Sequence, residues 1–199
     1  MRILKVQKLS QSELERIVNL HYKILDESFL NNFGKNFLKV VYLTIVPSKT
    51  NITILTKEGE NVIGFLVATK NGDEFNQEVI QKNFLKLSWE ILKSSFLRPS
   101  LITRVIQWKF KPAHQNKIKP ELQFIAIDPR YQGQGIGTKM LKMLSQEFKK
   151  DGINQYRVGT KAQNELSNAF YQKLGFKEFY KNSFFGDDFN YYLSPSIAK

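Results

Sequence analysis

The sequence predicts a single α/β (α+β) domain, in which helices flank one mixed β-sheet. Of its 199 residues, 42% are hydrophobic and 13% are aromatic, which supplies enough apolar surface for a core of this size. Short runs rich in Ile, Val and Thr alternate with segments whose apolar residues recur at helical spacing. No repeat, linker or low-complexity tract divides residues 1–199, so we expect one domain.

The start of the chain predicts a strand and two helices. Leu4–Leu9 has the composition of a strand. Ser10 or Ser12 is a suitable N-cap for the next helix, because a short hydroxyl side chain can bond the free N–H groups of the first turn. The second helix is expected over Phe33–Ile45 and ends before Pro47, whose ring cannot continue it.

A β-hairpin comes next. Asn51–Leu55 and Val62–Thr69 are rich in β-branched residues, and they flank a turn that contains Gly59. These two runs are the second and third strands of the predicted sheet.

Residues 72–119 predict a helical insertion between the third and fourth strands. Apolar residues at helical spacing form its first helix, which ends at Pro99. Residues 101–106 predict a short second helix, and residues 109–119 a polar, basic loop. Two roles stay open for the insertion: a lid or oligomer contact that sets specificity, or extra cover for the core.

The last third alternates strands and helices. Leu122–Ile127 is a strand, residues 128–131 form a turn, and the glycine-rich segment Gln132–Gly137 opens a helix that ends at Asp151 and Gly152. The remaining elements are three strands and one helix: Tyr156–Thr160, the helix Asn164–Leu174, Phe176–Tyr180 and Phe189–Leu193.

Composition excludes several classes of protein. No apolar stretch approaches the ~20 residues of a membrane span, and no signal-peptide pattern is visible, so we expect a cytoplasmic protein without a membrane partner. The absence of Cys removes disulfides, thiolate metal sites and cysteine nucleophiles. His21 and His114 are far apart in the sequence, and no cluster has the spacing of metal ligands.

The net charge of +12 suits an anionic partner, yet it arises almost entirely from lysine, with 24 Lys and 6 Arg. No run of five basic residues occurs, and aromatic residues that could stack on single-stranded nucleic acid are not interleaved with the lysines. We therefore interpret most of the charge as a solvated surface and disfavour nucleic acid as a partner.

The glycine-rich turn predicts an anion site, because backbone N–H groups and the start of a helix converge there. Glycine lets phosphate oxygens approach the amides. A P-loop requires Gly-Lys-Ser/Thr, but here Gly137 is followed by Thr138 and Lys139. A dinucleotide fingerprint requires a third glycine where Thr138 stands, so both of these alternatives are disfavoured.

The same residues resemble a known family. Residues 132–137, with the pattern Gln-x-x-Gly-x-Gly after a strand, resemble the acetyl-CoA signature of the GNAT (GCN5-related N-acetyltransferase) superfamily. Residues 164–176 resemble its second cofactor motif, Asn-x-x-Ala-x-x-Leu-Tyr-x-x-x-Gly-Phe, with Ser167 and Phe170 as departures. The resemblance covers residues 121–180 and, more weakly, the N-terminal strand and helices.

This resemblance implies a GNAT-like sheet, splayed between Leu122–Ile127 and Tyr156–Thr160, with acetyl-CoA as co-substrate in the opening. Backbone groups of Ile125 and Ile127 would pair with the pantetheine amides, and the glycine-rich turn would cradle the pyrophosphate. The implied cofactor-binding residues are Ile125, Ala126, Ile127, Gln132, Gly133, Gln134, Gly135, Ile136, Gly137, Thr138, Asn164 and Tyr171.

The resemblance also implies catalytic residues. Tyr171 stands where many family members keep the tyrosine that protonates the CoA sulfur, and Glu121 where one branch keeps its catalytic base. His114 is a second candidate base by its intrinsic pKa. Lys139 and Lys173 are candidates for contact with the CoA phosphates, and Asn164 also serves as a helix cap.

The predicted function is direct acetyl transfer from acetyl-CoA to a primary amine of a small metabolite or amino sugar, since no Cys is present for an acetyl-enzyme. The alternatives are a protein or peptide N-acetyltransferase and a non-catalytic CoA- or nucleic-acid-binding module. A homodimer also stays open as the oligomeric state.

Overall fold

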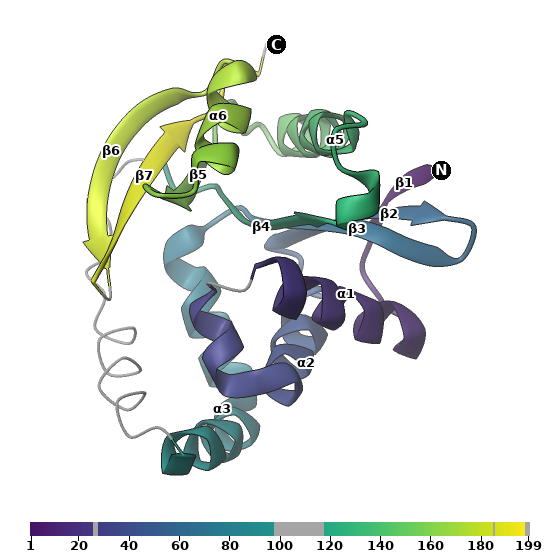
Figure 1. The fold of residues 1–199 in the computed structure, drawn as a ribbon, viewed down its shortest axis with the longest axis vertical. Coiled ribbons are helices and arrows are strands. Elements are labelled where there is room, and N and C mark those ends of the chain that lie inside the picture. The colour runs from purple at the N-terminus through teal and green to yellow at the C-terminus, as the bar shows by residue number, and fades with distance from the viewer. Residues whose placement is uncertain (26–27, 98–117, 185, 198–199) are drawn as a thin grey trace.

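The computed structural model describes residues 1–25, 28–97, 118–184 and 186–197 (Figure 1). Seven strands form one sheet in the order β1-β2-β3-β4-β5-β7-β6, and every neighbouring pair is antiparallel except β4 with β5. The strands are β1 (Arg2–Val6), β2 (Asn51–Glu58), β3 (Asn61–Thr69), β4 (Glu121–Ile127), β5 (Arg157–Lys161), β6 (Lys177–Phe184) and β7 (Asp187–Leu193).

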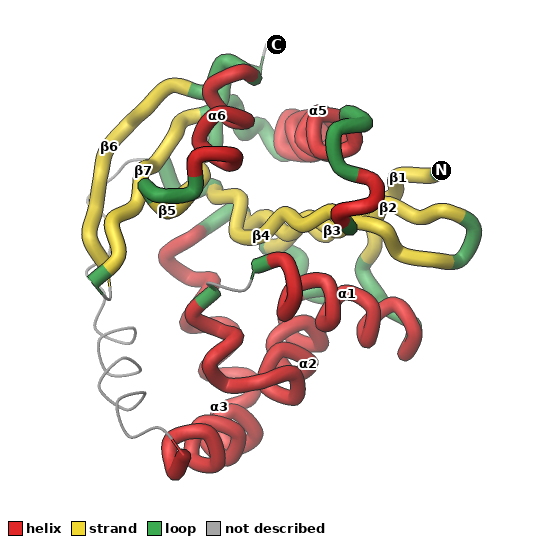
Figure 2. The backbone as a smooth tube through the Cα atoms, viewed as in Figure 1, coloured by secondary structure: helices red, strands yellow, loops and turns green. Residues whose placement is uncertain are grey.

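Helices cover both faces of the sheet (Figures 1 and 2). One face carries α1 (Gln11–Ile24), α2 (Gly34–Ile45) and α3 (Gly72–Leu97), and the other carries α5 (Ile136–Lys150) and α6 (Glu165–Lys173). Each layer encloses its own cluster of buried apolar residues, which we call the α1–α3 core and the α5–α6 core. The mixed α/β architecture expected from the sequence is confirmed.

Local chemistry explains where the first elements begin and end. Ser10 is the N-cap of α1: its hydroxyl accepts from the Glu13 N–H, and the Glu13 carboxylate accepts from the Ser10 N–H. A short 3₁₀ helix, η1 (Phe29–Phe33), precedes α2. The hairpin strands extend further toward their turn than expected. Glu58 still pairs with Asn61, and Gly59, at φ +57°, closes the two-residue turn between them.

Helix α3 confirms the first helix of the insertion and packs against α2. Its Phe75, Val79 and Leu87 are buried in the α1–α3 core, so this part of the insertion covers the core. The helix is kinked at Asn83, whose side-chain amide bonds Thr44 of α2. The helix predicted at 101–106, nearly all of the predicted basic loop and His114 lie outside the described residues.

A β-bulge in β4 changes which residues face which core. Val67 pairs with Phe124 and Ala68 with Leu122, so Gln123 is an extra residue without a partner on β3. Because strand side chains alternate with a period of two, the extra residue reverses the alternation. Leu122 therefore belongs to the α5–α6 core, whereas Phe124 packs on the α1–α3 core.

The sheet opens immediately beyond this bulge. Strands β4 and β5 pair only at Glu121 with Arg157 and at Leu122 with Val158. Within the described residues, the remainder of β4 pairs with β3 alone, so residues 123–127 present an unpaired edge toward the gap. The splay that the resemblance implied is confirmed by this pairing.

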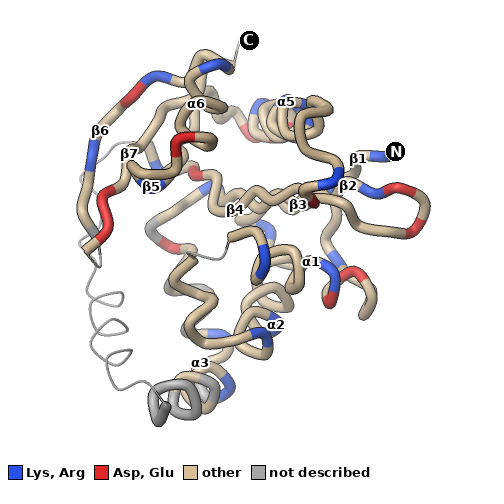
Figure 3. The backbone as a smooth tube through the Cα atoms, viewed as in Figure 1, with Lys and Arg blue, Asp and Glu red and all other residues tan. Residues whose placement is uncertain are grey.

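Charged positions are spread over many elements. Figure 3 shows Lys and Arg in both helical layers and along the sheet, interspersed with Asp and Glu.

In the described part of the chain, no helix combines the length and apolar character needed to cross a membrane. The same residues contain no group of His, Asp and Glu arranged to hold a metal ion.

His21 is fully buried in the α1–α3 core, and burial lowers its pKa from 6.5 to about 3. The folded protein keeps this imidazole neutral, whereas the unfolded chain takes up a proton below about pH 6.5. We therefore expect His21 to cost no stability above pH 6.5 and to lower the unfolding free energy by roughly 2 kcal/mol at pH 5, with the loss growing toward pH 3.

Urea unfolding at pH 7 and pH 5 measures this loss. In His21→Gln, which has no titrating ring at this position, the drop between the two pH values should be smaller by about that amount. The same pH dependence in both proteins would contradict the assignment.

Candidate active site

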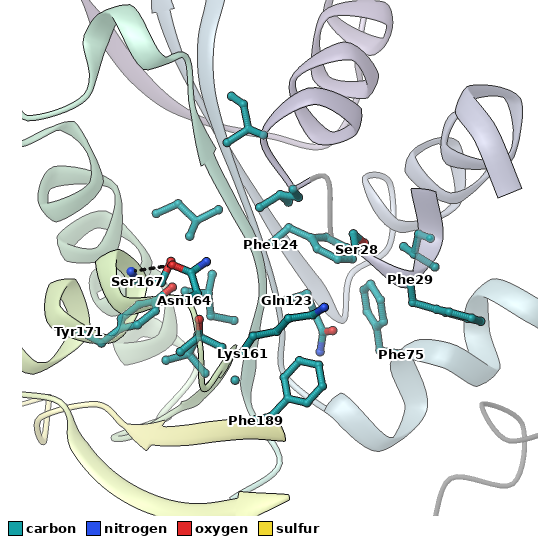
Figure 4. Close-up of a pocket in the computed structure, with 18 of the residues that line it drawn as sticks. Ser28, Phe29, Phe75, Gln123, Phe124, Lys161, Asn164, Ser167, Tyr171 and Phe189 are labelled. Atoms are coloured by element: carbon teal, nitrogen blue, oxygen red, sulfur yellow. Dashed lines mark hydrogen bonds between the residues drawn. The ribbon is translucent and has the colours of Figure 1, made fainter. Parts of the chain in front are cut away.

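A cavity of about 480 Å³ lies between the diverging strands (Figure 4). Figure 4 shows Asn164 and Tyr171 on one side of it, Ser28, Phe29 and Phe75 on the other, and Gln123 and Lys161 between them. The lining continues along β4 and β5 and includes Leu122, Ile125, Val158, Gly159 and Thr160.

Tyr171 contributes a buried phenol to this cavity. It is 4% exposed, and its ring packs against Phe170, Phe176 and Tyr192. Burial raises the pKa of Tyr171 well above its ordinary value of 10, so the hydroxyl stays protonated at neutral pH. A protonated phenol at a cavity wall can donate a proton or a hydrogen bond to a bound group.

The start of α6 holds Asn164 beside the cavity. The Asn164 side chain accepts from the Ser167 N–H at 3.0 Å, so Asn164 caps α6 as expected. One turn later, Asn168 donates to the carbonyl oxygens of Lys161, Ala162 and Asn164, and accepts from the Tyr192 hydroxyl at 2.7 Å. These bonds fix α6 against the end of β5, and with it the position of Tyr171.

The glycine-rich turn follows β4 at the mouth of the splayed region. Gly133 and Gly135 have φ of +74° and +73°, in the left-handed region that favours glycine, and Gly135 is the residue from which α5 starts. The side-chain amide of Gln132 donates to the Ile127 carbonyl at 2.9 Å and ties the turn to the end of β4. Gly135, the N-cap residue of α5, is exposed.

A short 3₁₀ helix, η2 (Pro129–Tyr131), links β4 to this turn. Its N-cap is Asp128, which accepts from the Arg130 N–H and side chain and from Arg16 at 2.5 Å. The Arg130 hydrogen bonds, followed by that from Arg16, hold the pKa of Asp128 well below its usual range. The turn is therefore anchored by an ionised carboxylate at neutral pH.

Gly137 has a different physical role from Gly133 and Gly135. A Cβ at Gly137 would lie 3.0 Å from the Phe170 ring and 3.4 Å from the Ile127 side chain. The glycine thus permits α5 to pack closely on α6 and β4. The sequence attributed this residue to phosphate access, whereas the contact that a side chain would meet first is helix packing.

The structure does not bring every predicted residue to the cavity wall. Tyr171, Asn164 and Ile125 line the cavity, and Ala126 is buried against the α1–α3 core. Ile127 packs on the α5–α6 core. The turn and helix-start residues lie outside the cavity wall: Gln132, Gly133, Gln134, Gly135 and Thr138 are exposed, whereas Ile136 and Gly137 are buried.

Glu121 is engaged in an ion pair at the base of the splay. Both Nε and an Nη of Arg157 donate to its Oε2, at 3.1 and 2.8 Å, and the Arg157 side chain is only 2% exposed. On β4, the residues that line the cavity start at the next position, Leu122. The two candidate phosphate contacts, Lys139 and Lys173, are exposed on α5 and α6.

Several residues that line the cavity were not expected from the sequence. Ser28, Gln123 and Lys161 reach the cavity from three different elements, and none belongs to a cofactor motif. Gln123 is placed by the bulge, which has no sequence signature here, and Ser28 precedes a 3₁₀ helix that apolar spacing did not indicate. The one available signal was the position of Ser28 directly before an apolar segment, which is typical of an N-cap.

The chain is similar to known proteins in sequence and in fold. Residues 20–176 match the model of the Acetyltransferase (GNAT) family, which is well over half of the chain. The ribosomal protein bS18-alanine N-acetyltransferase of Escherichia coli K12 is 41% identical over 54 residues, 27% of this chain. The match spans only 36% of that protein's own length.

Two further relatives extend the comparison. N-alpha-acetyltransferase 30 of Schizosaccharomyces pombe is 34% identical over 79 residues, which cover 38% of this chain and 53% of that protein. The crystal structure of PaiA N-acetyltransferase from Thermoplasma acidophilum in complex with coenzyme A has a TM-score of 0.57 at 18% identity, covering 96% of this chain and 98% of that chain. This structural likeness shows a shared fold.

Proposed function

The chain belongs to the GNAT acetyltransferase family, and from this membership we propose that it is an N-acetyltransferase that moves an acetyl group from acetyl-CoA directly to a primary amine. The observation that carries the proposal is the opening between β4 and β5, with Tyr171 and Asn164 on its wall and the glycine-rich turn at its end. The resemblance in the sequence and the geometry thus concern the same residues.

The residues present fit acetyl-CoA. The edge of β4 from Gln123 to Ile127 is unpaired within the described residues, so its backbone groups are free to bond an extended chain of amides. The Ile127 carbonyl already accepts from Gln132, which leaves Ile125 as the better placed of the two predicted backbone contacts. The N–H groups of the Gln132–Gly137 turn and the α5 N-terminus suit a pyrophosphate.

The thioester and the protein make separate contributions to the proposed reaction. Acetyl-CoA supplies an activated acyl group, and no Cys is present in the chain to take that group over. The amine nitrogen forms a bond to the acyl carbon while the carbon–sulfur bond breaks. The nitrogen loses one proton to solvent, and Tyr171 gives a proton to the departing thiolate and regains one from solvent, so that the products are the amide and the CoA thiol.

The acceptor is proposed to be a primary amine of a small molecule, as the sequence suggested. A second candidate, the α-amine of a peptide, is favoured by the names of the two curated relatives, which describe N-acetylation of alanine in a ribosomal protein and N-alpha-acetylation. An amino sugar with several amines is the least favoured, because the described lining holds no Asp or Glu that could pair with additional ammonium groups.

Calorimetry with acetyl-CoA, followed by release of free thiol in the presence of acceptors, tests the proposal. The acceptor set includes L-leucinamide, an alanine-initiated tetrapeptide and glucosamine. We expect binding of acetyl-CoA and amine-dependent thiol release. Failure to bind acetyl-CoA would overturn the proposal, and binding without any amine-dependent release would leave the non-catalytic alternative as the better account.

The glycine-rich turn gives a prediction with a matched control. Gly135→Ala places a Cβ at φ +73° beside the expected pyrophosphate, and we expect acetyl-CoA affinity to fall by about tenfold and stability by about 1 kcal/mol. Gly152, which follows α5 in another turn, has φ +72° and equally open surroundings. Gly152→Ala should therefore cost similar stability in urea unfolding, while calorimetry shows unchanged affinity; equal affinity losses in both variants would contradict the placement.

A further inference from the structure

A serine hydroxyl on the wall opposite Tyr171 is held by a row of buried, hydrogen-bonded side chains that the proposed reaction does not use. Ser28 lines the cavity and occupies the N-cap position of η1, with the extended backbone usual there, φ −63° and ψ 131°. Its side chain nevertheless caps no backbone N–H. Instead, Ser28 Oγ lies 3.1 Å from His21 Nε2. The hydroxyl is therefore oriented by the α1–α3 core rather than by its own helix.

The other nitrogen of His21 fixes the direction of this bond. His21 Nδ1 lies 2.6 Å from the Tyr42 hydroxyl, and both side chains have no exposed surface. The buried phenol must donate its proton, and Nδ1 is its described acceptor. That assignment leaves the proton of neutral His21 on Nε2, which donates to Ser28 Oγ. The Ser28 O–H is then free to donate into the cavity.

The ring of His21 is also immobilised by packing. It stacks on Phe65 with an interplanar angle of 13° and meets Phe124 edge-on, with 4.9 Å between the ring centroids. Tyr42 is the titratable group that contacts the ring among the described residues, and no charged side chain bonds to it. A rotation of His21 would break both hydrogen bonds, so Ser28 has one preferred orientation.

A proton relay through this chain is the first alternative to weigh. The pKa of His21 is about 3, against about 10.4 for an alkylammonium group, so transfer of a proton from the acceptor amine to the ring is disfavoured by roughly 10⁷-fold. The chain therefore orients a hydroxyl and does not act as a base.

The surface beside Ser28 is apolar. Residues from η1, α2 and α3 line this half of the cavity, and among the described lining residues there is no Asp or Glu. The apolar residues are Phe29, Leu30, Val41, Phe75 and Val79. Such a wall stabilises an apolar group of the acceptor and offers a multiply charged acceptor no counter-charge.

We infer that the acceptor is a primary amine whose skeleton bears an apolar side group and a neutral hydrogen-bonding oxygen, with the oxygen bound by Ser28 and the side group held by the apolar wall. Ser28 is thus a specificity-determining residue, and His21 and Tyr42 are positioning residues that act through it. This inference rests on the proposed acetyl transfer and goes beyond it by naming the acceptor's chemistry. An α-aminoacyl amide has all three groups in this relation.

Two amines that differ in one group test it: L-leucinamide and isoamylamine. Both carry the same branched apolar group, and only leucinamide has the carboxamide oxygen. Because the carboxamide also lowers the pKa of the neighbouring amine, kcat/KM is compared per neutral amine. On that basis we expect leucinamide to exceed isoamylamine by about tenfold, the upper end of the effect of one hydrogen bond. Ser28→Ala should remove this ratio, and Ser28→Thr, which keeps the hydroxyl, should retain most of it. Ser167→Ala, a serine on the opposite wall, should leave the ratio unchanged.

The positioning role is tested by the same ratio. His21→Gln keeps an N–H donor near Ser28 and should preserve part of the preference, whereas His21→Leu should abolish it. General damage to the fold lowers the rates for both amines and does not change their ratio. If a His21 variant folds poorly, the comparison of Ser28→Ala with Ser28→Thr decides the inference.

The outcomes separate this inference from the proposed function. Glycinamide, which lacks the apolar group, should be a poorer acceptor than leucinamide by at least tenfold. Transfer to amines with no preference for leucinamide, or a preference that survives Ser28→Ala, would overturn the inference and leave the acetyltransferase proposal standing. Absence of acetyl-CoA binding would instead overturn the proposed function.

Discussion

Replacing Tyr171 by Phe should lower kcat by roughly 100-fold with little change in acetyl-CoA affinity. The phenol lies on the cavity wall, and burial keeps its pKa well above 10, so it is protonated before acetyl transfer begins. The departing thiolate develops negative charge, and a phenol that stays protonated at neutral pH can stabilise that charge by donating a hydrogen bond or a proton. Phe keeps the ring contacts with Phe170, Phe176 and Tyr192 and removes only the donor.

The measurement is steady-state thiol release at saturating acetyl-CoA, together with urea unfolding. Tyr156→Phe is the matched control, because Tyr156 is also a buried tyrosine of the α5–α6 core and does not line the cavity. We expect kcat of that control to stay within about twofold. If Tyr171→Phe kept full kcat while its fold and cofactor affinity were intact, the acid role of Tyr171 would be lost.

Replacing Arg157 by Met should lower the unfolding free energy by about 3–5 kcal/mol. Its guanidinium is buried, and both donors bonded to Glu121 converge on one carboxylate oxygen. Removal of the cation leaves a carboxylate in a poorly solvated position, because the Glu121 side chain is only 15% exposed. The pair also joins β4 to β5 where they part, so its loss should loosen the base of the splay.

Urea unfolding at pH 7 measures the effect. Lys181→Met is the control, since it breaks the exposed pair with Glu178 at 3.5 Å and should cost less than about 1 kcal/mol. Similar losses in the two variants would show that burial of the Arg157 pair carries no special weight.

The same pair decides the role of Glu121. If Glu121 is a catalytic base, Glu121→Gln should lower kcat by about 100-fold or more and reduce stability only modestly. If Glu121 is an ion-pair partner, Glu121→Gln should lower stability and keep kcat within about tenfold, because the buried Arg157 loses the carboxylate that its Nε and Nη bond. Since Oε2 is bound by Arg157 and Glu121 is not among the described residues that line the cavity, we expect the second result.

Some features followed from the sequence because they depend on near neighbours in the chain. The N-cap at Ser10, the hairpin turn at Gly59 and the start of α5 at Gly135 each rest on a side chain or a positive φ within a few residues. The two cofactor motifs are local for the same reason, since each combines a turn with a helix start. The family and the mixed sheet could therefore be predicted without tertiary information.

The sequence by itself thus determined the order of the strands and the longer helices and the family of this protein, and only the tertiary structure decided which side chains share the cavity. The extra residue Gln123 turns Leu122 and Phe124 to opposite cores, which no period-two pattern indicates. Ser28 is oriented by His21, which comes from another element, and Glu121 is bound by Arg157, which is 36 residues away along the chain. These outcomes depend on packing between distant segments, because a hydrogen bond or ion pair forms only where the fold brings its two partners together.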